Sequence, residues 1–163
     1  SIKKAVNLIL KANKVELYGV GGSSVIAMDA FHKFIRTGIK ANSYTDSHFQ
    51  LMSASQLTKE DVAIVISHSG SNKDILRILQ VLNENGTKTI GITGFAKSPL
   101  SQNVDVSLYT SSEETEYRPE ALASRIAQLS IIDALYVNLM ILNSHKAKTS
   151  FEKVRTAISE TRS

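Results

Sequence analysis

The sequence predicts an α/β fold, a three-layer sandwich in which helices flank a five-stranded parallel sheet. Short β-branched runs alternate with amphipathic segments along the chain, which is typical of strands joined by helical crossovers. The run Val62–Ile66 carries no charge, as expected for a strand buried on both faces. Two of the predicted strands end in a turn of glycine and serine that leads into a helix. These three observations favour a parallel sheet with right-handed crossovers.

The composition fits one domain with a substantial core. The chain has 163 residues, 42% of them hydrophobic, and a chain of this length buries roughly 70% of its unfolded surface. It has no cysteine, which excludes disulfides and thiolate metal sites. The net charge of +4 comes from scattered basic residues and does not favour direct nucleic-acid binding.

The beginning of the chain and its hydropathy give expectations about location. Ser1 starts within an apparent helix, so we expect this domain to belong to a longer protein. No uninterrupted apolar run is long enough to cross a bilayer, and the first residues lack a signal-peptide pattern. We therefore expect a cytoplasmic protein with no membrane partner.

The first strand, residues 15–20, follows a short amphipathic helix and leads into the turn that contains Gly21, Ser23 and Ser24. The glycines let the backbone approach a ligand closely, and the serines supply hydroxyls at a helix N-terminus, where anions bind well. In the helix that follows, the apolar positions form one stripe. They are Val25, Met28, Phe31 and Ile35.

The second strand is predicted over residues 39–44, after Gly38 ends the preceding helix. Asp46 or Ser47 then caps a third helix. His48 either faces the same pocket as the serine turns or is an exposed residue of the cap. Gly19-x-Gly21 is half of a dinucleotide fingerprint, whose full form requires Gly or Ala at Ser24, and Asp46 lies near the position of a ribose-binding acid, which leaves a nicotinamide cofactor open. We expect no cofactor, because the second serine turn has no role in that scheme.

That second turn follows the strand Val62–Ile66 and is the densest cluster of small polar residues in the chain. Its members are Ser67, Ser69, Gly70, Ser71 and Asn72. An amphipathic helix begins after it, so the hydroxyls and free N–H groups lie at the positive end of the helix dipole. Capping alone needs one such side chain, and the surplus favours phosphate binding.

Two further strands are predicted, at residues 87–93 and 104–109. Both serine turns follow the carboxyl ends of strands, and ligands of parallel sheets gather at that edge near the topological switch point. We therefore expect the two turns to form a single anion site.

The last third of the chain contains a polar segment and a strongly apolar helix. Residues 111–120 are the most polar of the chain, and the helix at 121–143 is apolar nearly all round. Such a helix must be buried on nearly all sides. The sheet covers one side, so we predict that a partner subunit covers much of the rest, in a homodimer or higher homo-oligomer. Phe151, Val154 and Ile158 predict a final amphipathic helix.

The paired turns, Gly19-x-Gly21-x-Ser23 and Ser67-x-Ser69-Gly70-x-Asn72, resemble the signature of the SIS (sugar isomerase) family over essentially the whole chain. The run from Tyr117 to Leu129 resembles more narrowly the SIS domain of RpiR-type transcriptional regulators. This resemblance implies a phosphosugar-binding fold that senses a sugar phosphate or amino-sugar phosphate. It also implies that DNA is bound only through an N-terminal helix-turn-helix domain outside this chain.

The resemblance assigns roles to particular residues. Four would hold the phosphate, namely Ser23, Ser67, Ser69 and Asn72, although the family usually has Thr in place of Asn72. Ser24 and Ser71 would support them, and Glu113, Glu116, Ser124 and Arg125 would lie near the sugar. The full predicted phosphosugar site is Gly21, Ser23, Ser24, Ser67, His68, Ser69, Gly70, Ser71, Asn72, Glu113, Glu116, Ser124 and Arg125, with no catalytic residue and no metal.

Several of these residues have a plain structural interpretation too. His68 either contacts the ligand or makes a structural hydrogen bond. Arg125 either meets an anion or forms an ion pair at the surface or interface. The cluster around Glu113 and Glu116 is more often a solvated acidic loop.

Three functions fit the sequence. The first is the effector-sensing domain of a regulator of carbohydrate metabolism, which needs no catalytic group. The second is an aldose-ketose isomerase or phosphosugar lyase, whose base and acid would come from His48, His68, Glu113 or Glu116. The third is a nucleotide-binding module.

Overall fold

The computed structural model describes residues 1–112 and 122–162 and contains one five-stranded parallel sheet in the order β2-β1-β3-β4-β5. The strands are β1 (Val15–Gly19), β2 (Ala41–Ser43), β3 (Val62–Ile66), β4 (Lys88–Thr93) and β5 (Val106–Tyr109). The predicted α/β fold with a five-stranded parallel sheet is confirmed. β1 lies between β2 and β3, so the strand order reverses there, and this is the position at which such sheets bind ligands.

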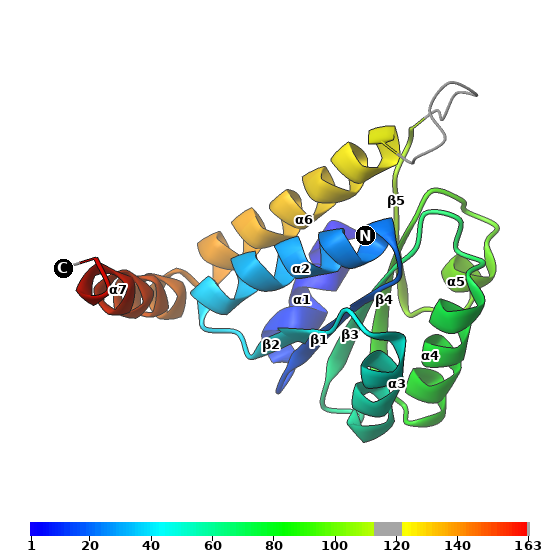
Figure 1. The fold of residues 1–163 in the computed structure, drawn as a ribbon, viewed down its shortest axis with the longest axis horizontal. Coiled ribbons are helices and arrows are strands. Elements are labelled where there is room, and N and C mark those ends of the chain that lie inside the picture. Colours follow the sequence, from blue (N-terminus) through cyan, green and yellow to red (C-terminus); the bar gives the residue numbers. More distant parts are fainter. Residues whose placement is uncertain (113–121, 163) are drawn as a thin grey trace.

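Helices cover both faces of the sheet (Figure 1). On one face lie α1 (Ile2–Lys11), α2 (Gly22–Phe34) and α6 (Leu122–Leu142). On the other lie α3 (Ser47–Gln56), α4 (Lys73–Glu84) and the short α5 (Pro99–Gln102). Successive residues of β3 alternate between the two cores: Ile64 joins the first, and Ala63 and Val65 join the second. This alternation buries every residue of the strand, which explains its uninterrupted hydrophobicity.

The apolar stripe predicted for α2 is not the face that the helix buries. Val25 is 60% exposed and Ile35 is 47% exposed. The helix instead buries Ile26, Ala27, Ala30 and Phe34. This face combines the large apolar side chains of Ile26 and Phe34 with two alanines, whose small volume lets the helix approach β1 and α6 closely.

Helix α6 buries one side and exposes the other. Ile132, Leu135 and Leu139 are fully buried against the sheet, whereas Ile126 is 69% exposed and Ile141 is 66% exposed. By length and composition, this 21-residue helix is also long enough to cross a bilayer. It is not an uninterrupted apolar run, because Arg125 and Asp133 lie within it. In this fold the buried side of α6 belongs to the core of the domain.

The ammonium group of Lys33 joins α6 to α2. It lies 2.7 Å from a carboxylate oxygen of Asp29 on its own helix and also hydrogen-bonds Asp133 of α6. Partial burial lowers the pKa of Lys33, but these two carboxylates outweigh it and raise the pKa above its ordinary value. The ion pair therefore helps to hold α6 beside α2.

The chain ends in α7 (Ser144–Glu160), which extends away from the sheet (Figure 1). It packs on the C-terminal end of α6 and on the 3-10 turn η1 (Ile35–Thr37) that follows α2. Ala147 is its buried residue. The predicted final helix is thus present, but most of its surface is exposed.

Candidate functional site

The first serine turn is a tight connection from β1 to α2. A Cβ atom on Gly19 would lie 2.4 Å from the carbonyl oxygen of Ser23, so only glycine allows the strand end to meet the helix this closely. Gly21 has a φ of 59°, which also favours glycine. The Ser24 hydroxyl donates to the Gly21 carbonyl at 2.6 Å. The Ser23 hydroxyl makes no hydrogen bond to another described residue and is half-buried.

The second serine turn uses its side chains internally. Ser67 Oγ accepts from the Gly70 N–H at 3.2 Å, and Ser69 Oγ accepts from the Ser71 N–H at 3.3 Å. Asn72 Oδ1 accepts from the Ile75 N–H at 3.1 Å and caps α4. A hydroxyl that accepts a hydrogen bond keeps its own proton for donation. Both serines can therefore donate to an anion while the turn stays intact.

The imidazole of His68 is held in place by the end of β4. The His68 carbonyl accepts from the Gly94 N–H at 2.9 Å and from the Thr93 hydroxyl at 3.0 Å. A Cβ on Gly94 would lie 2.8 Å from the ring, and Phe95 packs edge-on with its ring centre 5.4 Å away. The ring is therefore fixed by packing, and its buried Nδ1 has no hydrogen-bond partner.

Arg125 of α6 lies directly over the first turn of α2. A Cβ on Gly22 would come within 3.2 Å of a terminal guanidinium nitrogen of Arg125 and within 3.3 Å of Nε. Arg125 Nε is buried without a partner in the part of the chain that the structure describes. This half-buried arginine beside a helix N-terminus combines a full positive charge with the positive end of the dipole, an arrangement that suits an anion.

These groups surround a cavity of about 310 Å³ at the carboxyl ends of β1 and β3. Its lining residues are Val20, Gly22, Ser23, His68, Ser124, Arg125 and Gln128. Three of them, His68, Arg125 and Gln128, each carry a buried polar atom without a hydrogen-bond partner. Such atoms are rare in folded proteins because each one costs free energy. Their concentration around one cavity makes it the candidate binding site in the described part of the chain.

The structure brings together four of the predicted site residues at this cavity: Ser23, His68, Ser124 and Arg125. The others in the two turns lie beside it at the same sheet edge: Gly21, Ser24, Ser67, Ser69, Gly70, Ser71 and Asn72. Glu113 and Glu116 lie outside the described residues. His48 is exposed at the start of α3 and does not line the cavity.

Gln128 is the cavity residue that sequence reasoning missed. It lies four positions after Ser124 on α6, so both side chains lie on the same face of the helix. Both are buried. The spacing of two small or uncharged polar residues, Ser124 and Gln128, on one face of a mostly apolar helix was the available signal. Among residues 1–112 and 122–162, no group of three or more His, Asp or Glu side chains could hold a metal ion.

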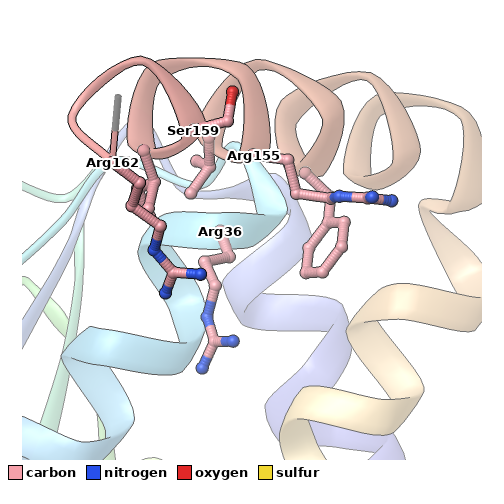
Figure 2. A pocket seen from close by; sticks show the side chains of 7 residues that line it. Arg36, Arg155, Ser159 and Arg162 are labelled. Atoms are coloured by element: carbon pink, nitrogen blue, oxygen red, sulfur yellow. The ribbon is translucent and has the colours of Figure 1, made fainter.

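A second hollow, of about 380 Å³, lies under α7 (Figure 2). Phe151, Val154 and Ile158 supply its apolar part, and Arg36, Arg155 and Arg162 lie around it with Ser159. It adjoins η1, at the opposite end of α2 from the cavity. A helix of 13 residues is about 20 Å long, so the two hollows are separate sites.

Comparison with known proteins gives a family match over most of the chain. The model of the SIS domain matches residues 8–138. An HTH-type transcriptional regulator of Caldanaerobacter subterraneus, of uncharacterized function, is 46% identical over 136 residues. These residues are 83% of this chain and 48% of that protein. The HTH-type transcriptional regulator RpiR of Escherichia coli K12 is 35% identical over 152 residues, 93% of this chain and 51% of the regulator. The chain thus spans about half the length of the curated relatives it matches.

Solved structures give the same fold. The Vibrio vulnificus NanR protein complexed with ManNAc-6P superposes with a TM-score of 0.91 at 25% identity. The match covers 98% of this chain and 60% of NanR. A candidate sugar-phosphate isomerase from Listeria monocytogenes superposes with a TM-score of 0.85 at 26% identity, over 94% of this chain and 81% of that one. NanR and a candidate isomerase therefore share this fold.

Proposed function

Because the chain belongs to the SIS-domain family and is similar to the SIS domains of RpiR-type regulators, we propose that it binds a sugar phosphate as the effector-sensing domain of a transcriptional regulator. The cavity at the ends of β1 and β3 is the binding site. The observation that carries this proposal is the set of three unpartnered buried polar atoms around that cavity, on His68, Arg125 and Gln128.

The chemistry of the cavity fits a phosphorylated sugar. Arg125 and the N-terminus of α2 supply positive potential, and Ser23 supplies a free hydroxyl. The second turn adds the hydroxyl protons of Ser67 and Ser69. Phosphate oxygens accept several hydrogen bonds at once, so donors from two neighbouring strand ends can share one phosphate. A ligand of the NanR type, ManNAc-6P, has both this anion and the sugar hydroxyls that neutral donors require.

Regulation requires only that the ligand binds two arrangements of the protein with different affinity. The exposed apolar side of α6, with Ile126 and Ile141, is the surface we assign to a second copy of this chain. Ligand binding beside Arg125 on the same helix would then shift how two copies pack. A helix-turn-helix domain outside this chain would bind DNA, and the protein would act in the cytoplasm on genes of carbohydrate metabolism.

A sugar-phosphate isomerase is the second candidate, because a candidate isomerase shares the fold. Isomerisation needs a base that removes a proton from carbon. Among the described residues that line the cavity, His68 is the side chain that could act as this base. Incubation with sugar phosphates in deuterated water separates the two candidates: a sensor returns its ligand unlabelled, whereas an isomerase incorporates deuterium.

Thermal-shift measurements with hexose phosphates, amino-sugar phosphates and muramic acid 6-phosphate test the proposal. A ligand at one hundred times its Kd stabilises the folded state by about 2.7 kcal/mol, which raises Tm by about 5 to 10 °C for a domain of this size. The unphosphorylated sugars are the matched controls and should give no shift.

Paired serine variants locate the site of any ligand that this screen identifies. Ser69→Ala should weaken binding far more than Ser101→Ala, whose hydroxyl donates to backbone carbonyls of the α5 region. Equal effects of the two variants would contradict the assignment of the second turn to the site.

A further inference from the structure

Gln128 is a buried glutamine whose side chain has no partner. The residue is 2% exposed, and its Nε2 is buried without a hydrogen bond. No hydrogen bond joins its side chain to another described residue. An amide nitrogen that is buried without an acceptor for its N–H groups costs free energy, so the unpartnered Nε2 needs an explanation.

Gln50 shows how this chain treats a glutamine that serves the fold. It is also fully buried, and although its Oε1 has no hydrogen-bond partner, its Nε2 donates to the carbonyl oxygens of Gly19 at 2.8 Å and Tyr44 at 2.7 Å. These bonds fix α3 against the ends of β1 and β2. Gln128 makes no comparable contact, so the fold gives no reason for a carboxamide at that position.

The place of Gln128 supplies the reason. It lines the cavity, one helical turn along α6 from Arg125. Arg125 lies against Gly22, where the charge and the helix dipole favour an anion. A neutral carboxamide has no such preference for charge, but it hydrogen-bonds well to a hydroxyl, ring oxygen or carbonyl. The two side chains therefore suit different parts of one ligand.

We propose that Gln128 determines sugar specificity: its Nε2 donates to an uncharged oxygen of the sugar while the phosphate lies at Arg125 and the N-terminus of α2. This inference rests on the sugar-phosphate function proposed above. Sites that hydrogen-bond a particular ligand group reject analogues that lack it, because the buried protein group is then left unpaired. Within the described chain Gln128 Nε2 has no partner, so a sugar that supplies an acceptor satisfies it and one that lacks the acceptor does not.

The test compares Gln128→Met with the unaltered chain, since methionine keeps the length of the side chain without its hydrogen bonds. We measure Tm without ligand and the Kd for ManNAc-6P and for inorganic phosphate by calorimetry. The inference predicts an unchanged or higher Tm, at least a tenfold weaker Kd for ManNAc-6P, and a Kd for inorganic phosphate within twofold. Gln50→Met is the matched control and should lower Tm, because two backbone carbonyls lose their donor.

Other outcomes overturn the inference in distinguishable ways. A lower Tm of Gln128→Met with an unchanged Kd for ManNAc-6P would make Gln128 a packing residue. An equal loss of affinity for ManNAc-6P and for inorganic phosphate would mean that Gln128 contacts the phosphate group and not the sugar. If the unaltered chain bound inorganic phosphate but none of the sugar phosphates screened above, the proposed function and this inference would both fail. If it bound a sugar phosphate that Gln128→Met bound equally well, the inference alone would fail.

Discussion

The turn after β1 and the turn after β3 end neighbouring strands of one sheet, but they use their hydroxyl groups differently. In the first turn, Ser23 faces the cavity without a hydrogen bond to another described residue, and Ser24 donates its proton to Gly21. In the second, Ser67 and Ser69 accept hydrogen bonds from backbone N–H groups of the turn itself. The Ser23 hydroxyl of the first turn is thus open to a ligand, whereas hydrogen bonds within the second turn already fix the orientation of its serines.

This difference shows that a count of hydroxyls does not measure what they offer a ligand. A serine that donates internally, such as Ser24, must break a hydrogen bond before it can donate to an anion. A serine that accepts internally, such as Ser69, keeps its proton and gains a fixed orientation. The direction of each internal hydrogen bond therefore decides which serines are ready to bind.

The largest expected effect concerns the glycines of the two turns. Gly21 and Gly70 have similar φ values, 59° and 63°, so alanine at either position is strained by about 1 to 3 kcal/mol. A Cβ on Gly21 meets nothing within 4 Å, but on Gly70 it would lie 2.3 Å from Ser98 Oγ. Gly70→Ala should therefore lose about 2 kcal/mol more stability than Gly21→Ala, measured by urea denaturation. Equal losses would show that the second turn is not the more tightly packed of the two.

The next effect concerns the charge beside the first turn. Arg125→Met removes charge-assisted hydrogen bonds worth about 1.5 to 3 kcal/mol, so affinity for a sugar phosphate should fall about 10-fold to 100-fold in calorimetry. Arg155→Met in the hollow under α7 is the matched control and should leave affinity unchanged. A larger loss of sugar-phosphate affinity from Arg155→Met than from Arg125→Met would show that the anion binds in that hollow.

A smaller effect separates two neighbouring serines of the first turn. Ser23→Ala should weaken sugar-phosphate binding by roughly 5-fold, the value of one hydrogen bond of about 1 kcal/mol. Ser24→Ala should change the Kd less than twofold, because its proton is already donated to Gly21. The reverse order in fluorescence or calorimetric titrations would mean that the turn rearranges when the ligand binds.

The smallest effect concerns the ion pair that holds α6 beside α2. Lys33 is partly exposed, so its pairs with Asp29 and Asp133 contribute between about 0 and 1 kcal/mol. Lys33→Met should lower the free energy of unfolding by no more than this, with the Kd for ligand unchanged. A clear loss of affinity would show that this bridge positions Arg125.

The fold was predictable because its strands and turns carry local signals. β3 is uncharged, and glycines and small polar residues follow β1 and β3, so strand, turn and helix could be assigned in order. The second strand was predicted over residues 39–44, whereas β2 spans Ala41–Ser43. The packing face of α2 was wrong because Val25 and Met28 were chosen, while the helix buries Ile26 and Phe34 together with two alanines that allow close contact with β1 and α6.

The site was predictable only in part, because it depends on contacts between segments far apart in the sequence. The serine turns could be recognised locally, and the family resemblance added Ser124 and Arg125. Nothing local indicates that Arg125 lies over Gly22, or that Gln128 is left without a partner. Both facts depend on how α6 crosses α2 and the end of the sheet.

The most direct test of the central claim is an NMR titration of the ¹⁵N-labelled chain with the sugar phosphate that gives the largest thermal shift. The account predicts that the backbone amide signals of Gly22, Ser23 and Ser69 move together with one Kd, while those of Arg155 and Ser159 in α7 stay in place. Shifts confined to α7, or movement of one turn without the other, would contradict a single phosphate shared by the two strand ends.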